Sequence, residues 1–520
     1  MVRIVLPHLR AALAHLRPAA SWASTRPTIT RRAMSTGPPR HAFAGRVAPM
    51  SVNAPTSSTS ARMRAAAFAW SRAAARRGLS TVAAPATASH GSSIGATTLV
   101  SHPIVGRWFL FSASLVFGIV VVGGITRLTE SGLSITEWNV VRGMAWPSSQ
   151  EAWEVEFSKY QESPEYKILN HSISLSEFKN IFYWEWLHRN LGRTIGAVFL
   201  LPTIYFTFTR PSASRIAKAL AGSAANPAVA ARWITPGMTK VAWTCCVFVG
   251  FQGALGWYMV KSGLENDILD HQHATPRVSQ YRLAAHLGSA FVIYILSLWS
   301  GMEVLSQWRQ AVVSGPSPYR QQLAALPASA LKAARSFRGS VHGVAALVFL
   351  TALSGAFVAG LDAGLVYNTW PLMGGAWIPP TPELFRKISR TSINGNAEMQ
   401  PVDPTERITL ADLIKDGRWK NVFENPATVQ FDHRMLAYTT LAGISAVFVK
   451  AHRLALPPPV RTAAAVLLGA GLGQATLGVL TLLYFVPLEL AAAHQGGSLV
   501  VLSSALWLMQ RMKQVMPLRK

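Results

Sequence analysis

The hydrophobic pattern of the chain consists of long apolar segments separated by polar loops. Eight segments reach or approach the roughly 20 residues that an α-helix needs to cross the hydrocarbon of a bilayer. They lie at 107–126, 190–209, 239–260, 283–302, 340–360, 435–451, 463–485 and 490–510. The pattern therefore predicts an all-α membrane protein with eight transmembrane helices.

The second half of the chain repeats the first. These residues recur 232 positions later in the same order: Gly123 as Gly355, Gly132 as Gly364, Leu133 as Leu365, Trp138 as Trp370 and Gly143 as Gly375. Gln252 and Gly256 recur 222 positions later as Gln474 and Gly478. An even number of spans in each unit preserves orientation, so we expect two parallel four-helix bundles, at 100–310 and 335–515. A chance match of small and aromatic residues is the alternative.

Four of the fourteen histidines share one position, since each opens an even-numbered span on the same side of the membrane. They are His188 and His286 in the first half and His433 and His494 in the second. Two imidazoles on facing helices of a bundle are the arrangement that six-coordinate haem iron requires. Structural histidines and a copper or zinc site are the alternatives, although neither half offers a cysteine ligand or an obvious carboxylate beyond Glu185.

Three arginines flank this level of the bundle. Arg189 and Arg434 directly follow the first histidine of each half, and Arg127 closes the first span. A guanidinium binds a carboxylate bidentately, so these residues are candidate partners of haem propionates. Snorkelling of the side chains to the membrane interface is the alternative.

The two halves differ beside the first histidine. Glu185 stands three residues before His188 on the same helix face, whereas Gln430 holds this position in the second half. A carboxylate near a low-dielectric pocket can move protons or stabilise developing positive charge, and an amide cannot titrate. We therefore expect chemistry in the first half and electron handling in the second. A structural Glu185, capping the helix or paired with Arg189, is the alternative.

The N-terminal hundred residues contain thirteen arginines, no lysine and no acidic residue, and they are rich in Ala, Ser and Thr. This composition is typical of a mitochondrial transit peptide, which we assign, with a disordered lead, to residues 1–95. A basic tail that stays attached, or a chloroplast address, is the alternative. Because half of the net charge of +26 falls in this leader, the charge does not indicate a nucleic-acid partner.

Composition and loop charge place the rest of the chain in the mitochondrial inner membrane. Half of the residues are hydrophobic and only 14% are charged, and the adjacent Cys245 and Cys246 give neither a disulfide framework nor zinc spacing. Loops 210–238 and 303–339 are basic, as are the sixth connection and the tail. The positive-inside rule puts these segments and both termini in the matrix, so the histidines lie towards the intermembrane space.

Seven segments resemble the haem A synthase family, the mitochondrial Cox15 and bacterial CtaA proteins. They are GGITRLTESGLSITEW at 123–138, EWLHRNLGR at 185–193, QGALGWYMVKSGL at 252–264, RLAAHLGSA at 282–290, GLDAGLVYNTWPLMGG at 360–375, FDHRMLAY at 431–438 and AAAHQGGS at 491–498. The resemblance covers about residues 100–510. The external cysteine pair that bacterial members often carry is absent from the loops of this sequence.

The resemblance implies an oxidoreductase that converts the C8 methyl of haem O to a formyl group, giving haem A for cytochrome c oxidase assembly. Two hydroxylations and loss of water from a geminal diol are the implied course. By position, His433 and His494 would ligate a resident haem b, His188 and His286 would bracket the substrate haem, and Glu185 would assist the oxidation. Implied partners are mitochondrial ferredoxin as electron donor, haem O synthase, oxidase assembly factors and membrane lipids; a homo-oligomer is compatible with all of these.

Two other functions fit haem binding. A two-haem b-type membrane electron carrier without haem-modifying activity would hold two permanent haems and would tolerate the loss of Glu185. A haem or quinone carrier is disfavoured by the parallel repeat and by the lack of Gly/Pro-interrupted spans at matching midplane positions.

Overall fold

The computed structural model describes the part of the chain that carries the apolar segments. The described residues are 98–139, 145–220, 229–264, 277–314, 327–391, 397–400, 403, 405–454 and 456–515. The transit peptide predicted at 1–95 lies outside them, as do Gly143 and the extreme C-terminus on which the orientation of the termini partly rests.

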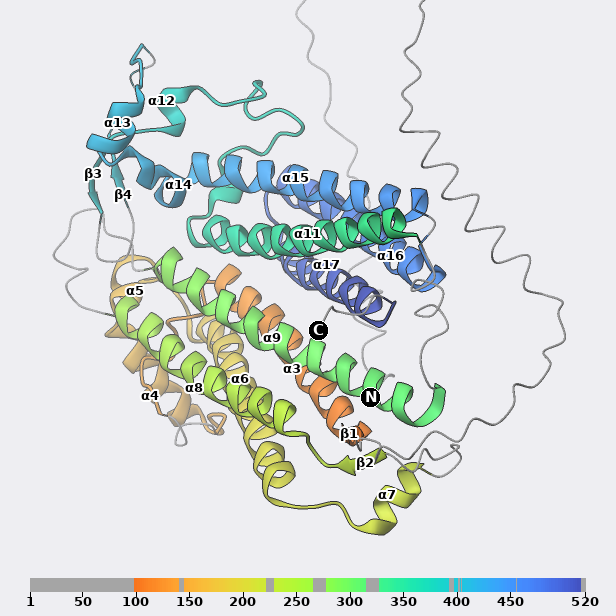
Figure 1. Ribbon diagram of the computed structural model, residues 1–520. Coiled ribbons are helices and arrows are strands. Elements are labelled where there is room, and N and C mark those ends of the chain that lie inside the picture. The colour runs from red at the N-terminus through yellow and green to blue at the C-terminus, as the bar shows by residue number, and fades with distance from the viewer. Residues whose placement is uncertain are drawn as a thin grey trace, which may run out of the picture. The chain divides into compact units, whose positions relative to one another are not determined.

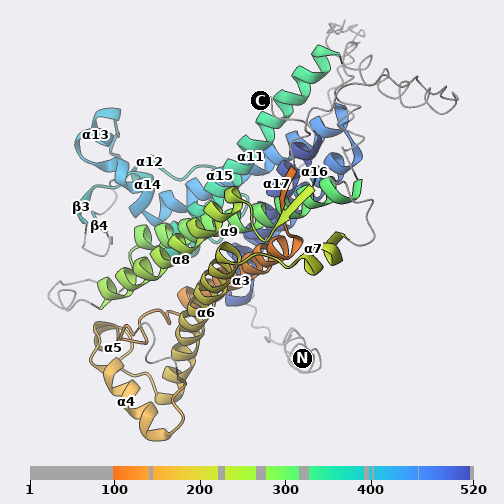
Figure 2. The ribbon, with the colours of Figure 1, turned by 60° about the horizontal axis from the view of Figure 1, so that its bottom comes forward.

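Each predicted span is covered, to within two residues at its C-terminal end, by one long helix of the described chain (Figures 1 and 2). In the first half these are α3 (Pro103–Leu128), α6 (Leu175–Phe208), α8 (Pro236–Gly263) and α9 (Gln280–Trp308). In the second half they are α11 (Ala328–Gly360), α15 (Pro426–Arg453), α16 (Pro458–Leu483) and α17 (Leu488–Val515). Prolines in the first turns of α3, α8, α15 and α16 start helices without losing a hydrogen bond, because those N–H groups have no partner within the helix.

Among the described helices, α3, α6, α8, α9, α11 and α16 are long and apolar enough to cross a membrane. The protein is therefore an all-α membrane protein in its main body. The helices α15 and α17 occupy the other two predicted spans, at 435–451 and 490–510, and they are more polar. Residues that lower their hydropathy include Arg434, Thr439 and Thr440 in α15, and His494, Gln495 and Ser498 in α17.

The long helices pack in two groups of four, which Figure 1 shows in orange to green and in green to blue. In the first group α6 and α9 each contact both α3 and α8, and in the second α15 and α17 each contact both α11 and α16. The groups meet where α3 lies against α17 and α9 against α11. One apolar core runs through both, with Val116, Phe291, Val344 and Leu499 among its buried members.

The helix α6 begins fifteen residues before the predicted span, at Leu175 rather than 190. The Ser174 hydroxyl and the Glu177 carboxylate form a capping box at its start. The extension is stabilised by a separate aromatic cluster, in which Phe178 and Phe182 pack on Trp153 and Tyr160. Trp153 and Tyr160 come from α4 (Gln150–Gln161), which lies with α5 (Pro164–Ile168) near this end of α6 (Figure 2).

The remaining elements are short, and they lie before α3 or in the connections between the long helices. Two small sheets depart from the all-α prediction: β1 (Thr98–Ser101) pairs in parallel with β2 (Val229–Arg232), and β3 (Ile388–Thr391) pairs antiparallel with β4 (Ala397–Met399). The short helices are α7 (Ala213–Leu220), α12 (Thr381–Leu384), α13 (Leu410–Lys415) and α14 (Asn421–Glu424). Four-residue strands carry too weak an alternation of polar and apolar residues to be predicted from sequence.

The helix α5 buries one carboxyl group, that of Glu165, which is 4% exposed. Burial raises the pKa of Glu165 to about 8, and also raises the pKa of the neighbouring Tyr160 phenol. The Glu165 side chain is therefore protonated at neutral pH in the folded protein.

This burial predicts that the protein loses stability as the pH rises. In the unfolded chain Glu165 ionises above its ordinary pKa of 4.5, whereas in the folded chain it stays protonated to about 8. Between pH 4.5 and about 8, this group alone lowers the free energy of unfolding by about 1.4 kcal/mol for each pH unit. We expect the thermal midpoint of Glu165→Gln to fall less than that of the wild type between pH 5 and 8. Glu154→Gln, on the exposed face of α4, is the matched control and should follow the wild type.

Candidate functional site

The structure brings the four predicted histidines together as two pairs. The rings of His188 on α6 and His286 on α9 lie 6.4 Å apart between centroids, at an interplanar angle of 61°. The rings of His433 on α15 and His494 on α17 also lie 6.4 Å apart, at 81°. Both pairs join helices that face each other across a group, because each member packs against the two helices between them. The sequence therefore predicted both pairings correctly.

The separation of the rings fits one metal ion between two imidazoles. A metal about 2 Å from each coordinating nitrogen places the two ring centroids about 6 Å apart. Among the described residues no cluster of three or more His, Cys, Asp or Glu side chains could hold a metal ion. Two imidazoles are the number of protein ligands that six-coordinate haem iron takes.

A glycine on an intervening helix lies against each of the four imidazoles. A Cβ atom built on Gly123 would lie 2.8 Å from Cε1 of His188, and one on Gly478 would lie 2.8 Å from Cε1 of His494. The corresponding distances are 3.4 Å from Gly256 to His286 and 3.5 Å from Gly355 to His433. Glycine at these positions leaves room for the ring beside the helix, and the four positions are two repeat-related pairs. The repeat identified the glycines from sequence, but not their contacts.

Hydrogen bonds to the histidines are similar in the two halves at the backbone and different at the ring. The Gln252 amide donates to the carbonyl of His286 at 3.0 Å, as the Gln474 amide does to that of His494 at 2.8 Å. The Nδ1 atom of His433 lies 2.7 Å from the Ser354 hydroxyl. In the first half, the Nδ1 atoms of His188 and His286 are buried without a hydrogen-bond partner among the described residues.

Glu185 lies on α6, three residues before His188, and is buried, with 3% of its surface exposed. One carboxylate oxygen accepts hydrogen bonds from the Ser134 hydroxyl and the Ile135 backbone N–H, both at 2.7 Å. The other oxygen pairs with the Arg189 guanidinium, whose Nε lies 3.0 Å away. The structure therefore contains the pair of Glu185 with Arg189, which is the structural alternative to a catalytic Glu185. This geometry fixes the position of the carboxylate one helical turn from His188.

Gln430 occupies the equivalent place in the second half and is also buried. Its amide donates to the Tyr367 carbonyl at 3.3 Å. Tyr367 lies 232 residues after Ile135, so the same loop position gives an N–H to the carboxylate of Glu185 and a carbonyl to the amide of Gln430. The two halves thus place an acid or an amide against the same loop position, and only the first half has a carboxylate there.

Arg189 and Arg434 hold these loops in the same way. Arg189 donates to the carbonyls of Ile135 and Glu137, both at 2.7 Å, and Arg434 donates to those of Tyr367 and Thr369, both at 2.9 Å. The acceptor pairs are again 232 residues apart. Arg189 also stacks on Trp138, with its guanidinium carbon 5.0 Å from the ring centroid. Each arginine therefore fixes the loop that follows the first helix of its half.

Arg127 connects the two halves. Its guanidinium donates to Asp362 at 3.0 Å, and Asp362 also pairs with Arg277. Asp362 and its repeat-related residue Glu130 both adopt left-handed backbone conformations, at φ 49° and 51°, which turn the chain at the ends of α11 and α3. Sequence reasoning missed Asp362, since neither its turn nor its two arginine partners could be inferred from the apolar pattern.

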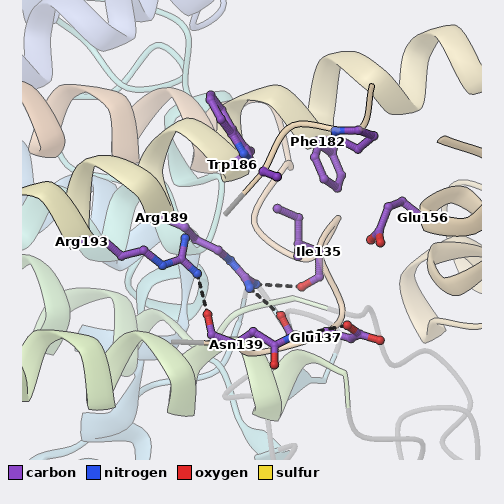
Figure 3. Close-up of a pocket in the computed structure, with 10 residues that line it drawn as sticks. Ile135, Glu137, Asn139, Glu156, Phe182, Trp186, Arg189 and Arg193 are labelled. Carbon is purple, nitrogen blue, oxygen red and sulfur yellow. Dashed lines mark hydrogen bonds between the residues drawn. The ribbon is translucent and has the colours of Figure 1, made fainter. Parts of the chain in front are cut away.

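A cleft opens beside the pair of Glu185 and Arg189, between α6 and the loop after α3 (Figure 3). Phe182, Trp186, Arg189 and Arg193 of α6 form one wall, and the loop supplies Ile135, Glu137, Asn139, Ala145 and Pro147, with Glu156 from α4. Figure 3 shows the guanidinium groups of Arg189 and Arg193 turned towards the loop, where Arg193 donates to the carbonyl of Asn139 at 2.6 Å. The lining combines aromatic side chains with two arginines and two glutamates, so its formal charges balance.

Comparison with known proteins shows which family the chain resembles. The family model described as COX15-CtaA, cytochrome oxidase assembly protein, matches residues 106–506. A Homo sapiens protein named Heme A synthase COX15 is 42% identical over 436 residues, covering 84% of this chain and 89% of its own. A Heme A synthase of Nitrosospira multiformis is 38% identical over 420 residues, covering 80% and 95%. A Schizosaccharomyces pombe protein named Heme A synthase-mitochondrial ferredoxin fusion protein is 42% identical over 426 residues, covering 81% and 62%.

Proposed function

This chain belongs to the COX15-CtaA family of cytochrome oxidase assembly proteins, and from that membership we infer that it is a haem A synthase. It is an oxidoreductase that converts the C8 methyl of haem O to a formyl group, and its product serves assembly of cytochrome c oxidase. The observation that carries the proposal is one opposed pair of imidazoles in each half of a chain that matches haem A synthases over most of its length.

We propose that all eight long helices cross the mitochondrial inner membrane, as two parallel four-helix repeats at 100–310 and 335–515. Six of them are apolar enough by themselves, and α15 and α17 pack among these helices with their histidines turned to each other. The basic connections then face the matrix with both termini, and the histidines lie towards the intermembrane space. Residues 1–95 serve as the transit peptide.

We propose that His433 and His494 hold a resident haem b. The fit rests on the 6.4 Å ring separation, on the glycines against both rings and on the hydrogen bond at Nδ1 of His433. Haem b bound between two histidines supplies one-electron transfer. The role of the protein is to hold both imidazoles in place and to exclude other ligands from the iron.

The first half is the proposed site of the substrate, haem O. His188 and His286 bracket its iron, and the aromatic cleft beside α6 lies at the same end of the helix. Glu185 supplies the one ionisable group that the second half lacks. Its carboxylate is held by Ser134, Ile135 and Arg189 and takes up a proton, or stabilises positive charge, as the methyl is oxidised. Two hydroxylations, each with an external oxidant as the source of oxygen, and the loss of water from the resulting geminal diol would then give the formyl group.

The three arginines are proposed to serve the haem propionates in two ways. The Nε atoms of Arg127 and Arg434 are buried and lack a hydrogen-bond partner among the described residues, so they can donate directly to a propionate. Both Nη atoms and Nε of Arg189 already donate to Ile135, Glu137 and Glu185. Arg189 therefore acts through the loop that it holds.

Ferredoxin is the proposed electron donor, because the Schizosaccharomyces pombe relative is named as a fusion of a haem A synthase with mitochondrial ferredoxin. Haem O synthase is the proposed source of the substrate, and oxidase assembly factors are the proposed recipients of the product.

Extraction and chromatography of haems from cells with and without the chain test the function. Haem O should accumulate and haem A should vanish when the chain is absent, and both changes should reverse when it is restored. A two-haem b-type electron carrier would leave haem A unchanged in both cases.

The contact at Gly478 gives a direct test of the resident haem site. A Cβ in Gly478→Ala would lie 2.8 Å from the His494 ring, so the ring must move from its position opposite His433. We expect haem b content to fall about tenfold, as measured by pyridine haemochrome after purification. Gly473→Ala on the same helix is the matched control, because its Cβ meets nothing within 4 Å and its haem content should stay normal.

A further inference from the structure

Ser354 sets the protonation pattern of His433. The Ser354 hydroxyl lies 2.8 Å from the Thr351 carbonyl and 2.7 Å from Nδ1 of His433. A hydroxyl has one proton to donate, and a carbonyl can only accept, so the proton of Ser354 goes to Thr351. The short contact to His433 must then be a hydrogen bond from Nδ1–H to the serine oxygen.

This arrangement prepares the other ring nitrogen for iron. A neutral imidazole that carries its proton on Nδ1 presents a lone pair at Nε2. A hydrogen bond that accepts the Nδ1 proton also fixes the orientation of the ring and makes the coordinating nitrogen more basic. His433 is therefore held as a preformed ligand by an uncharged group inside the bundle.

The first half lacks this arrangement. Val122 is the residue 232 positions before Ser354, and it precedes Gly123 as Ser354 precedes Gly355. Valine cannot accept a hydrogen bond, and Nδ1 of His188 is buried without a partner among the described residues. Nδ1 of His286 is likewise without a partner there, whereas Nδ1 of His494 lies 3.1 Å from the Gln474 amide.

We propose that Ser354 is a positioning residue that makes the second-half haem permanent, and that Val122 keeps the first-half haem exchangeable. The inference rests on the proposed function, in which one haem stays and the other arrives as haem O and leaves as haem A. Because the two sites have the same overall geometry, one site can retain its haem while the other releases it only if the ligands differ in strength. The serine hydroxyl, present at one site and missing at the other, provides it.

The test measures how fast the second-half haem leaves. The background carries His188→Ala and His286→Ala, so that haem binds only between His433 and His494, and apomyoglobin in excess takes up the haem that dissociates. Ser354→Ala should raise the dissociation rate 10- to 100-fold, roughly the effect of losing an outer-shell partner of a metal ligand. Ser354→Thr keeps a hydroxyl and should stay within about threefold of the serine chain.

A redox titration gives an independent measurement. A more basic imidazole favours ferric over ferrous iron, so Ser354→Ala should raise the midpoint potential of this haem. Each tenfold decrease in the preference for ferric iron raises the midpoint potential by about 59 mV. In the otherwise unaltered chain, Val122→Thr should raise the amount of haem A that copurifies with the protein and slow its release.

The outcomes separate this inference from the proposed function. If Ser354→Ala has the dissociation rate and potential of the serine chain while His433→Ala has lost the haem, the ligand assignment stands and the role of Ser354 is wrong. If His433→Ala keeps its haem, the ligand assignment itself is wrong. A threonine variant that releases haem as fast as the alanine variant would also overturn the role of the hydroxyl.

Discussion

Replacement of Glu185 by glutamine is expected to abolish haem A formation while haem b remains bound. Glutamine has nearly the same shape and is the residue that the second half carries at this place, as Gln430. It cannot take up a proton or carry negative charge. We expect haem A output to fall at least about 100-fold, the lower range for the loss of a general acid–base group. Haem extraction gives the output, and the reduced spectrum of the purified protein gives the haem b.

The control for this prediction must separate chemistry from stability. Glu185→Gln also removes the partner of Arg189, and breaking a buried ion pair destabilises a protein by about 3 to 5 kcal/mol. Glu303→Gln is a related change elsewhere, since the buried Glu303 carboxylate of α9 accepts from Gln510 and from the partly exposed Lys513 of α17. We expect Glu303→Gln to lose stability and to keep haem A output per molecule of folded protein. Normal output from Glu185→Gln would contradict the catalytic assignment.

The sequence predicted the long helices well because the bilayer constrains them strongly. A membrane-spanning helix must satisfy its backbone internally and present apolar side chains over about 20 residues, and both requirements are visible in sequence. The start of α6 was missed because its first turns lie beyond the apolar segment. There Phe178 and Phe182 are buried by Trp153 and Tyr160 rather than by lipid. The strands β1 to β4 were missed because pairings of three or four residues depend on distant partners.

The pairing of the histidines was predictable, and the surroundings of the histidines were not. The two histidines of each half lie at one depth on different helices of a four-helix unit, so an inward orientation brings His188 to His286 and His433 to His494. The loop contacts of Arg189 and Arg434 depend on backbone carbonyls, which every residue has and which no motif marks. Ser354 and Val122 could not be singled out from sequence for the same reason. The Ser354 hydroxyl matters only because the His433 ring lies beside it, and that contact is visible only in the structure.

Repeat symmetry explains where the two halves agree and where they differ. The loop contacts of the two arginines, the left-handed turns at Glu130 and Asp362 and the glycines against the rings recur at matching positions. These features hold two imidazoles at a fixed separation, which both sites need. The halves differ at Glu185 against Gln430, at Val122 against Ser354, at Leu187 against Asp432, and in the contact of Gln474 with Nδ1 of His494. The first of these differences gives the first half a carboxylate, and the second places a hydroxyl beside Nδ1 of His433.

Loss of His433 is expected to remove the resident haem, and loss of His188 is expected to leave it. The two residues are repeat-related, and each lies 6.4 Å from its partner ring, so their substitution by alanine makes the same local change. Because iron in the second half then has one protein ligand, we expect haem b in His433→Ala to fall about tenfold or more. His188→Ala should keep its haem b and lose haem A formation.

Pyridine haemochrome spectra of the two purified variants distinguish the sites, and His342→Ala serves as a common control. His342 lies on α11, where Nδ1 contacts the Arg338 carbonyl at 2.8 Å, and it belongs to neither pair. Its removal should change neither haem b nor haem A. Undiminished haem b in His433→Ala would exclude that residue as a ligand. Equal losses of haem b in His433→Ala and His188→Ala would mean that both sites hold resident haem, as an electron carrier requires.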